Sequence, residues 1–109
     1  MKLEKRKPSG REKDEAAIEL LNKLREKLFS ENVSTARLAA FNLSWMQEDG
    51  LEILKNTLFG SNIATAKNAA AYGLRKMQGR MKKMALDVLK EGLKQRNNYT
   101  GEVCRSALE

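Results

Sequence analysis

The chain has 109 residues, which suffices for one domain with a modest hydrophobic core. It carries a net charge of +7, contains no histidine and has one cysteine. The commonest general base and zinc ligand are therefore missing, and no intramolecular disulfide can form. The apolar residues are mainly leucine and alanine, and the single proline, Pro8, stands near the start. Because no segment alternates as a strand does, the composition predicts an all-α protein.

Residues 1–13 differ in composition from the rest of the chain. They are mostly charged and contain Pro8 and Gly10, with too few apolar residues to form a core. We expect a disordered charged tail over residues 1–13 and a folded domain over residues 14–109.

The expected domain repeats itself. A shift of thirty residues places Leu24–Arg37 on Leu54–Lys67, with six of the fourteen residues identical. A fainter third copy follows at a spacing of thirty-five. Self-similarity at this period is typical of stacked helical repeats. We therefore expect three repeats at about residues 16–49, 50–79 and 80–109.

Each copy predicts two helices. The first carries apolar residues at spacings of three and four, such as Leu24 and Leu28, which places them on one helix face. Turn-forming residues follow at 30–32, 60–62 and 96–98. Gly50 and Gly79 are placed to end the first two copies as helix C-caps. The second helix is rich in small residues that we expect to be buried where helices approach closely: Ala36, Ala39, Ala40, Ala66, Ala69 and Ala70.

The alanine-rich helices carry a family resemblance. The segments ARLAAFNLSWMQ (36–47) and AKNAAAYGLRKMQ (66–78) resemble the second helix of HEAT-like repeats, and the armadillo repeat has a closely similar pattern. Asn32 and Asn62 stand where many such repeats have an acidic loop residue. The resemblance covers roughly residues 18–109 and implies a short α-solenoid of about three HEAT-like helix pairs. Such folds serve as protein-interaction scaffolds and are occasionally adapted to nucleic acid, so the resemblance implies no reaction.

Positive charge is concentrated in repeats two and three. No acidic residue occurs between Glu52 and Asp87, and several lysines and arginines do. A basic surface of this kind favours nucleic acid or another polyanion, and a solvated face that only keeps the protein in solution is the alternative. The candidate anion-binding residues are Lys67, Arg75, Lys76, Arg80, Lys82 and Lys83.

An apolar stripe is the second candidate surface. Leu38, Phe41 and Trp45 follow one another at spacings of three and four, on a different face from the buried alanines. We expect the stripe to pack on neighbouring helices. If it is exposed instead, its aromatic residues would anchor a protein partner.

The sequence offers no arrangement of catalytic groups. The Glu48–Asp49 pair falls in an expected turn without a partner acid, base or metal ligand, and Cys104 has the helical spacing of a packed residue. We expect no enzyme activity, no catalytic residue, no metal site and no cofactor.

These observations predict a non-catalytic interaction module that binds a protein partner, with nucleic acid or another polyanion as the alternative. Without a membrane span or a signal peptide, we expect a cytoplasmic protein with no membrane partner. Val103, Ala107 and Leu108 have no following repeat to cover them. The C-terminal helix is therefore expected either to fray or to support weak self-association of an otherwise monomeric chain.

Overall fold

A computed structural model describes residues 15–95 and 99–109, so the expected tail at 1–13 and the turn at 96–98 lie outside the described residues. The described part contains six α-helices and no strand, which confirms the all-α prediction. The helices are α1 (Glu15–Leu28), α2 (Val33–Leu43), α3 (Gln47–Gly60), α4 (Ala64–Lys76), α5 (Arg80–Leu93) and α6 (Tyr99–Leu108). None of these helices is long and apolar enough to cross a membrane.

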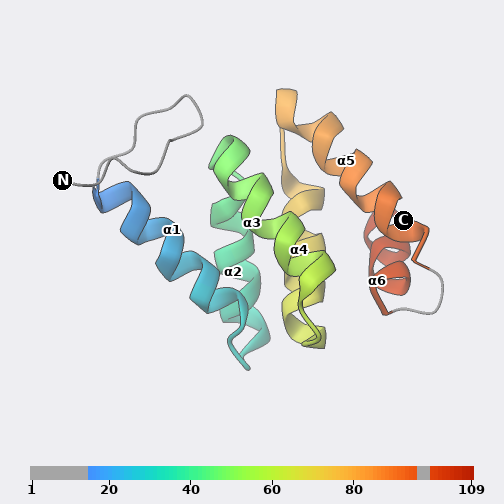
Figure 1. The fold of residues 1–109 in the computed structure, drawn as a ribbon, viewed down its shortest axis with the longest axis horizontal. Coiled ribbons are helices and arrows are strands. Elements are labelled where there is room, and N and C mark those ends of the chain that lie inside the picture. Colours follow the sequence, from blue (N-terminus) through green and yellow to red (C-terminus); the bar gives the residue numbers. More distant parts are fainter. Residues whose placement is uncertain (1–14, 96–98) are drawn as a thin grey trace.

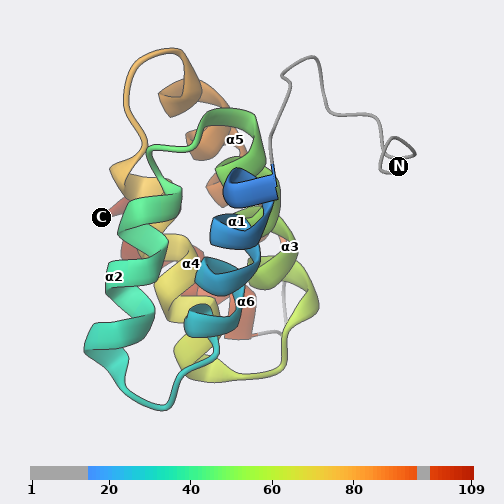
Figure 2. The same ribbon diagram turned by 90° about the vertical axis from the view of Figure 1, so that its left-hand side faces the viewer.

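The helices follow one another in pairs along the longest dimension of a body that measures 45 × 29 × 22 Å. Figure 1 shows the order, with α1 and α2 at one end and α5 and α6 at the other. Each odd-numbered helix contacts the next odd-numbered one, and each even-numbered helix contacts the next even-numbered one. The result is two layers, the even layer of α2, α4 and α6 and the odd layer of α1, α3 and α5. Figure 2 shows α2 and α4 on one side and α1 and α3 on the other.

Small side chains hold the even layer together. The six alanines that the sequence singled out are at most 2% exposed, so their predicted burial is confirmed. Gly73 of α4 extends this contact, because a Cβ atom there would lie 2.8 Å from the Ala40 carbonyl oxygen and 3.0 Å from the Ala40 Cβ atom. The backbones of α2 and α4 therefore lie closer together than larger side chains would permit.

The turns between paired helices use serine and asparagine as the sequence indicates. Asn32 precedes α2, and its side-chain oxygen accepts a hydrogen bond from the Thr35 backbone N–H at 3.1 Å. Ser30 accepts from the Asn32 N–H, and Ser61 accepts in the same way from the Ile63 N–H, each at 3.0 Å. These bonds satisfy backbone donors that have no partner within the helix.

The expected boundary at Gly50 is wrong. Gly50 does not end a helix: it lies buried in the first turn of α3, where a Cβ atom would meet the Leu43 carbonyl oxygen at 1.9 Å. Gln47 adopts a φ of 51° where α3 begins, and Glu48 and Asp49 occupy the first helical turn instead of an inter-helix turn. Carboxylates favour that position because the helix N-terminus is electropositive.

Gly79 also differs from its expected role. It has a φ of 62° but precedes α5 as its N-cap, two residues after the C-cap of α4 at Met77. The positive φ explains why glycine suits this position.

The C-terminal helix is covered better than the sequence suggests. Val103 is buried, and Ala107 and Leu108 are partly buried against the core, so these residues are covered in part without a following repeat. Gly92 explains part of this packing, because a Cβ atom there would lie 2.2 Å from the Cys104 sulfur. Fraying or weak self-association of the C-terminal helix stays a prediction.

Replacing Ala70 by leucine tests the tight packing of the even layer. Ala70 is fully buried, so the added volume should lower the free energy of unfolding by about 1–3 kcal/mol through overpacking. Ala64→Leu is the matched control, because Ala64 lies exposed in the same helix and should tolerate the change. Urea unfolding followed by circular dichroism measures both variants, and equal stability of the two would contradict the packing.

Candidate functional site

The six candidate anion-binding residues do not form one surface. Lys67 is only 6% exposed. Its ammonium group donates to the Leu58 carbonyl oxygen at 2.6 Å and to the Thr100 hydroxyl oxygen. Lys67 therefore joins the last turn of α3 to the start of α6 and is not available to a partner.

Lys67 also affects the buried thiol on α6. Burial lowers the pKa of Lys67, and the charge of Cys104 acts in the opposite direction. Burial raises the pKa of the Cys104 thiol to about 11, against a smaller lowering by Lys67. Because a thiol needs to ionise to become a good nucleophile, Cys104 is an inert packed residue, as its helical spacing predicts.

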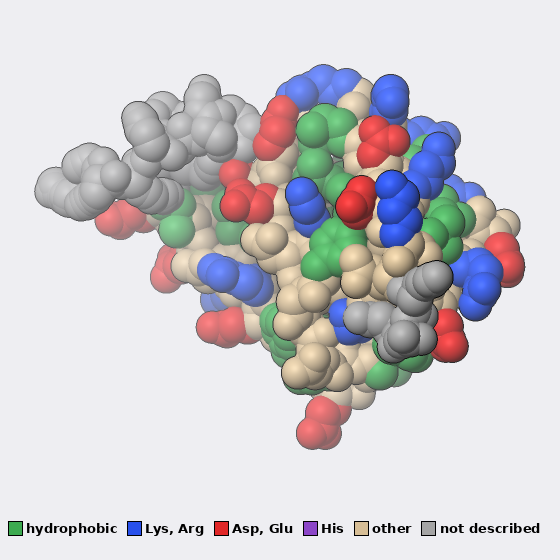
Figure 3. Space-filling model, turned by 45° about the vertical axis from the view of Figure 1, so that its right-hand side comes forward, with side chains coloured by type: hydrophobic (Ala, Val, Ile, Leu, Met, Phe, Trp, Pro, Cys, Tyr) green, Lys and Arg blue, Asp and Glu red, His purple; other side chains and the backbone are tan. Residues whose placement is uncertain are grey.

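The cations at the start of α5 lie among carboxylates. Figure 3 shows Lys and Arg side chains gathered at the end of the molecule where α5 begins, with acidic side chains beside them. Arg80 pairs with Glu48 at 2.7 Å, and Lys83 lies 3.5 Å from Asp87. Lys82 is exposed on the same turn. These exposed pairs contribute little to stability, but they reduce the positive potential that the sequence led us to expect here.

The remaining two candidates lie in the last turn of α4. Arg75 donates through its Nε atom to the Ala107 carbonyl oxygen of α6 at 2.8 Å. The Lys76 ammonium group lies 5.4 Å from the centre of the Tyr72 ring. The Arg37 guanidinium of α2 lies 5.3 Å from the same ring centre. Both distances are within the range of cation–π attraction.

Sequence reasoning missed Arg37 and Tyr72 as candidate site residues. The repeat alignment contained a signal, since the shift of thirty pairs Arg37 with Lys67, and a slip of one further residue after that segment pairs Phe41 with Tyr72. The spacing of four between Tyr72 and Lys76 also places those two residues on one face of α4. The approach of Arg37 from another helix could be found only from the tertiary structure.

The apolar stripe is exposed, so the expectation that it packs on neighbouring helices is wrong for its two ends. Leu38 is 61% exposed and Trp45 is 60% exposed. The Phe41 and Trp45 rings meet edge to face, with centres 6.1 Å apart and planes at 83°. Phe41 is partly buried on α2, and Trp45 lies in the turn after the helix ends at Leu43, so the edge-to-face contact joins the end of α2 to this turn.

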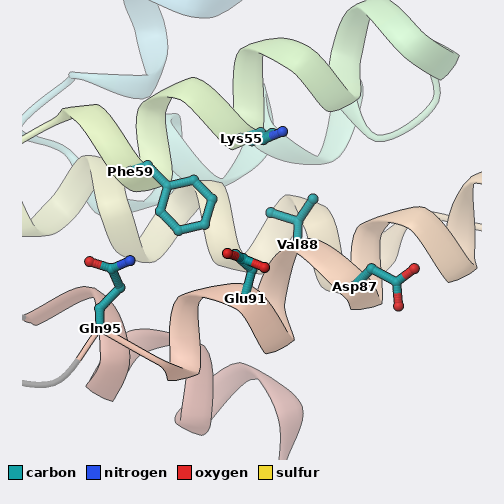
Figure 4. A pocket seen from close by; sticks show the side chains of 6 residues that line it. All are labelled: Lys55, Phe59, Asp87, Val88, Glu91 and Gln95. Carbon is teal, nitrogen blue, oxygen red and sulfur yellow. The ribbon is translucent and has the colours of Figure 1, made fainter.

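A groove separates α3 from α5 on the odd-helix side. It encloses about 620 Å³ and is lined by Lys55, Phe59, Asp87, Val88, Glu91 and Gln95. Figure 4 shows the Phe59 ring pointing from α3 towards Val88 and Glu91 of α5. The lining contains the carboxylates of Asp87 and Glu91 and the ammonium group of Lys55, so the groove carries only a small excess of negative charge.

Among the residues that the structure describes, no group of three histidine, cysteine, aspartate or glutamate side chains is placed to hold a metal ion. No known protein family matches the chain, and neither a curated protein nor a solved structure is found to resemble it. The chemistry of the surfaces is therefore the basis for a functional proposal.

The raised pKa of Cys104 predicts how stability depends on pH. The folded protein holds the thiol proton more tightly than the unfolded chain, whose thiol has an ordinary pKa of 9.0. This contribution to stability is complete below pH 9 and is lost as the pH rises through about 11. The two-unit difference corresponds to at most about 3 kcal/mol.

Urea unfolding between pH 8 and about pH 11 should show the loss in the wild type and not in Cys104→Ala, which lacks the titrating group. Because the pKa of Lys67 is lowered in the folded protein, the titration of Lys67 raises the stability as the pH rises. Lys67 is present in both proteins, so the comparison between them isolates the thiol. Parallel stability curves for the two proteins would contradict a perturbed thiol.

Proposed function

We propose that the protein is a non-catalytic interaction module that binds a protein partner through the apolar stripe of Leu38, Phe41 and Trp45. The observation that carries the proposal is the exposure of both ends of the stripe, 61% for Leu38 and 60% for Trp45. Exposed tryptophan and leucine at one site favour a partner because covering them removes apolar surface from water. Tryptophan is also among the residues that contribute most to binding at protein interfaces.

The succession of helix pairs supports a HEAT-like scaffold as the framework. The pairs α1–α2, α3–α4 and α5–α6 fall close to the three sequence repeats, and helices of one layer contact their next neighbours. A short α-solenoid of this type presents one layer of helices as a continuous surface. Leu38 and Phe41 of the stripe lie on α2, at the first position of the even layer, and Trp45 lies in the turn that follows the Ser44 C-cap.

The polyanion alternative is supported less well. Lys67 is inside the fold, and Arg80 and Lys83 each have a carboxylate within ion-pair distance. Duplex DNA binding depends on many cations meeting phosphates along one surface. The six cations that the sequence predicts as anion-binding residues do not present such a surface. The apolar stripe also gives no advantage for binding the charged phosphates of a duplex.

The double variant Leu38→Ser, Trp45→Ser tests the proposal. The full chain, immobilised as bait, should capture a protein from a lysate of its natural source, and that protein is then purified for titration. Loss of the two anchors should raise the dissociation constant about 10- to 100-fold, which corresponds to about 1.4–2.8 kcal/mol.

Leu20→Ser with Met84→Ser is the matched control, because these exposed apolar residues lie on α1 and α5, in the odd layer. The control variant should bind as the wild type does. An equal loss in both variants, or no loss in the stripe variant, would contradict a binding role for the stripe.

A further inference from the structure

Two cations from different helices converge on one tyrosine ring. Arg37 of α2 and Lys76 of α4 both lie within 5.4 Å of the centre of the Tyr72 ring, so their charged groups are at most about 11 Å apart. At physiological salt the Debye length is about 8 Å, so repulsion between two exposed charges near this upper limit is largely screened. Each cation can still attract a carboxylate that comes within ion-pair distance of it.

The two helices that supply the ring and its two cations carry no carboxylate. Neither α2 nor α4 contains an aspartate or glutamate. On α6, Glu102 and Arg105 contribute one charge of each sign. The surface around Tyr72 therefore has a positive potential that is complementary to an acidic partner.

A hollow beside the ring has the size of a side chain. It encloses about 190 Å³, and its lining includes Arg37, Tyr72 and Arg75 together with Asn68 and Ser106. Pockets for small-molecule ligands usually enclose at least about 300 Å³. The hollow therefore suits one side chain of a peptide better than a free small molecule.

Arg37 connects the hollow to the helix that carries Leu38 and Phe41 of the apolar stripe. Arg37 lines the hollow and is the neighbour of Leu38 in the chain. It also lies one helical turn before Phe41, so the two side chains start from the same face of α2. One bound segment could reach both features without leaving the even layer.

Two other occupants fit the surface less well. A second copy of this chain, docked through the same face, would bring the positive surface around Tyr72 against an identical positive surface, and like charges would repel. Single-stranded nucleic acid would need open ring faces for base stacking. The Tyr72 ring already has two cations at cation–π distance, so base stacking would depend mainly on the exposed Trp45 ring.

We propose that the surface formed by α2 and α4 binds an acidic peptide segment that carries a large apolar side chain. Carboxylates of the segment would meet Arg37 and Lys76, and the apolar side chain would lie on the stripe of Leu38, Phe41 and Trp45. This inference rests on the proposed function and adds the chemical class of the partner.

Selection from a random library of displayed 12-residue peptides against the full chain tests the inference. The selected peptides should be rich in aspartate and glutamate and should contain leucine, phenylalanine or tryptophan. A leading peptide is then synthesised and titrated. Trp45 is the single tryptophan of the chain, so its fluorescence reports binding at the stripe directly when the chosen peptide lacks tryptophan.

The variant Arg37→Gln, Lys76→Gln should weaken binding of that peptide about 5- to 30-fold, because two charge contacts are lost at a partly exposed site. Lys55→Gln with Lys90→Gln removes the same charge from exposed positions of α3 and α5, in the odd layer, and should change affinity less than about twofold.

Other outcomes separate the two proposals. Selection of neutral or basic peptides whose binding requires Leu38 and Trp45 would overturn the acidic partner and leave the proposed function standing. Failure to select any peptide would count against both proposals. If a 15-residue oligodeoxythymidine binds as tightly as the best peptide and loses affinity with Arg37→Gln, Lys76→Gln, the surface binds nucleic acid and the inference is wrong.

Discussion

The close contact between α2 and α4 is the constraint on which the rest of the structure depends. Ala36, Ala39 and Ala40 on one helix meet an equally small set on the other, and Gly73 lies against the Ala40 carbonyl oxygen. Small side chains bury little apolar area each, so the energy of this contact comes from close approach and dense packing. Because the alanines turn inwards, the larger residues of α2 at Leu38 and Phe41 lie on its other faces.

The same contact also brings together the residues of the proposed binding surface. Arg37 can reach the Tyr72 ring only because α2 and α4 lie side by side. Lys67 stands at the position equivalent to Arg37 in the next repeat, yet it is buried and donates to Leu58 and Thr100. The same repeat position therefore has two different roles. In α4, Lys67 is buried and donates to oxygen atoms of α3 and α6. In α2, Arg37 is exposed and lies at cation–π distance from the Tyr72 ring of α4.

The sequence predicted the features that depend on periodicity. The spacing of Ala36, Ala40 and Ala70 indicated their burial, and the Ser and Asn residues near Asn32 indicated where helices break. The prediction that Gly50 ends a helix failed because glutamate, aspartate and glycine occur both in inter-helix turns and in the first turn of a helix. Only the packing of Gly50 against Leu43 decides between these two positions. The burial of Lys67 and the exposure of Trp45 depend on which helices become neighbours, and local pattern contains no information on that.

Proton NMR of the Tyr72 contacts tests the central claim that α2 and α4 together form the interaction surface. Protons above an aromatic ring resonate upfield, so the side-chain protons of Arg37 and Lys76 should be upfield in the wild type and not in Tyr72→Leu. In Gly73→Ala the added methyl group pushes against Ala40 on α2. We expect Arg37 to lose its upfield shift there, while Lys76, four residues from Tyr72 on the same helix, keeps its own. Unchanged Arg37 shifts in a folded Gly73→Ala protein would show that the surface does not depend on the approach of the two helices.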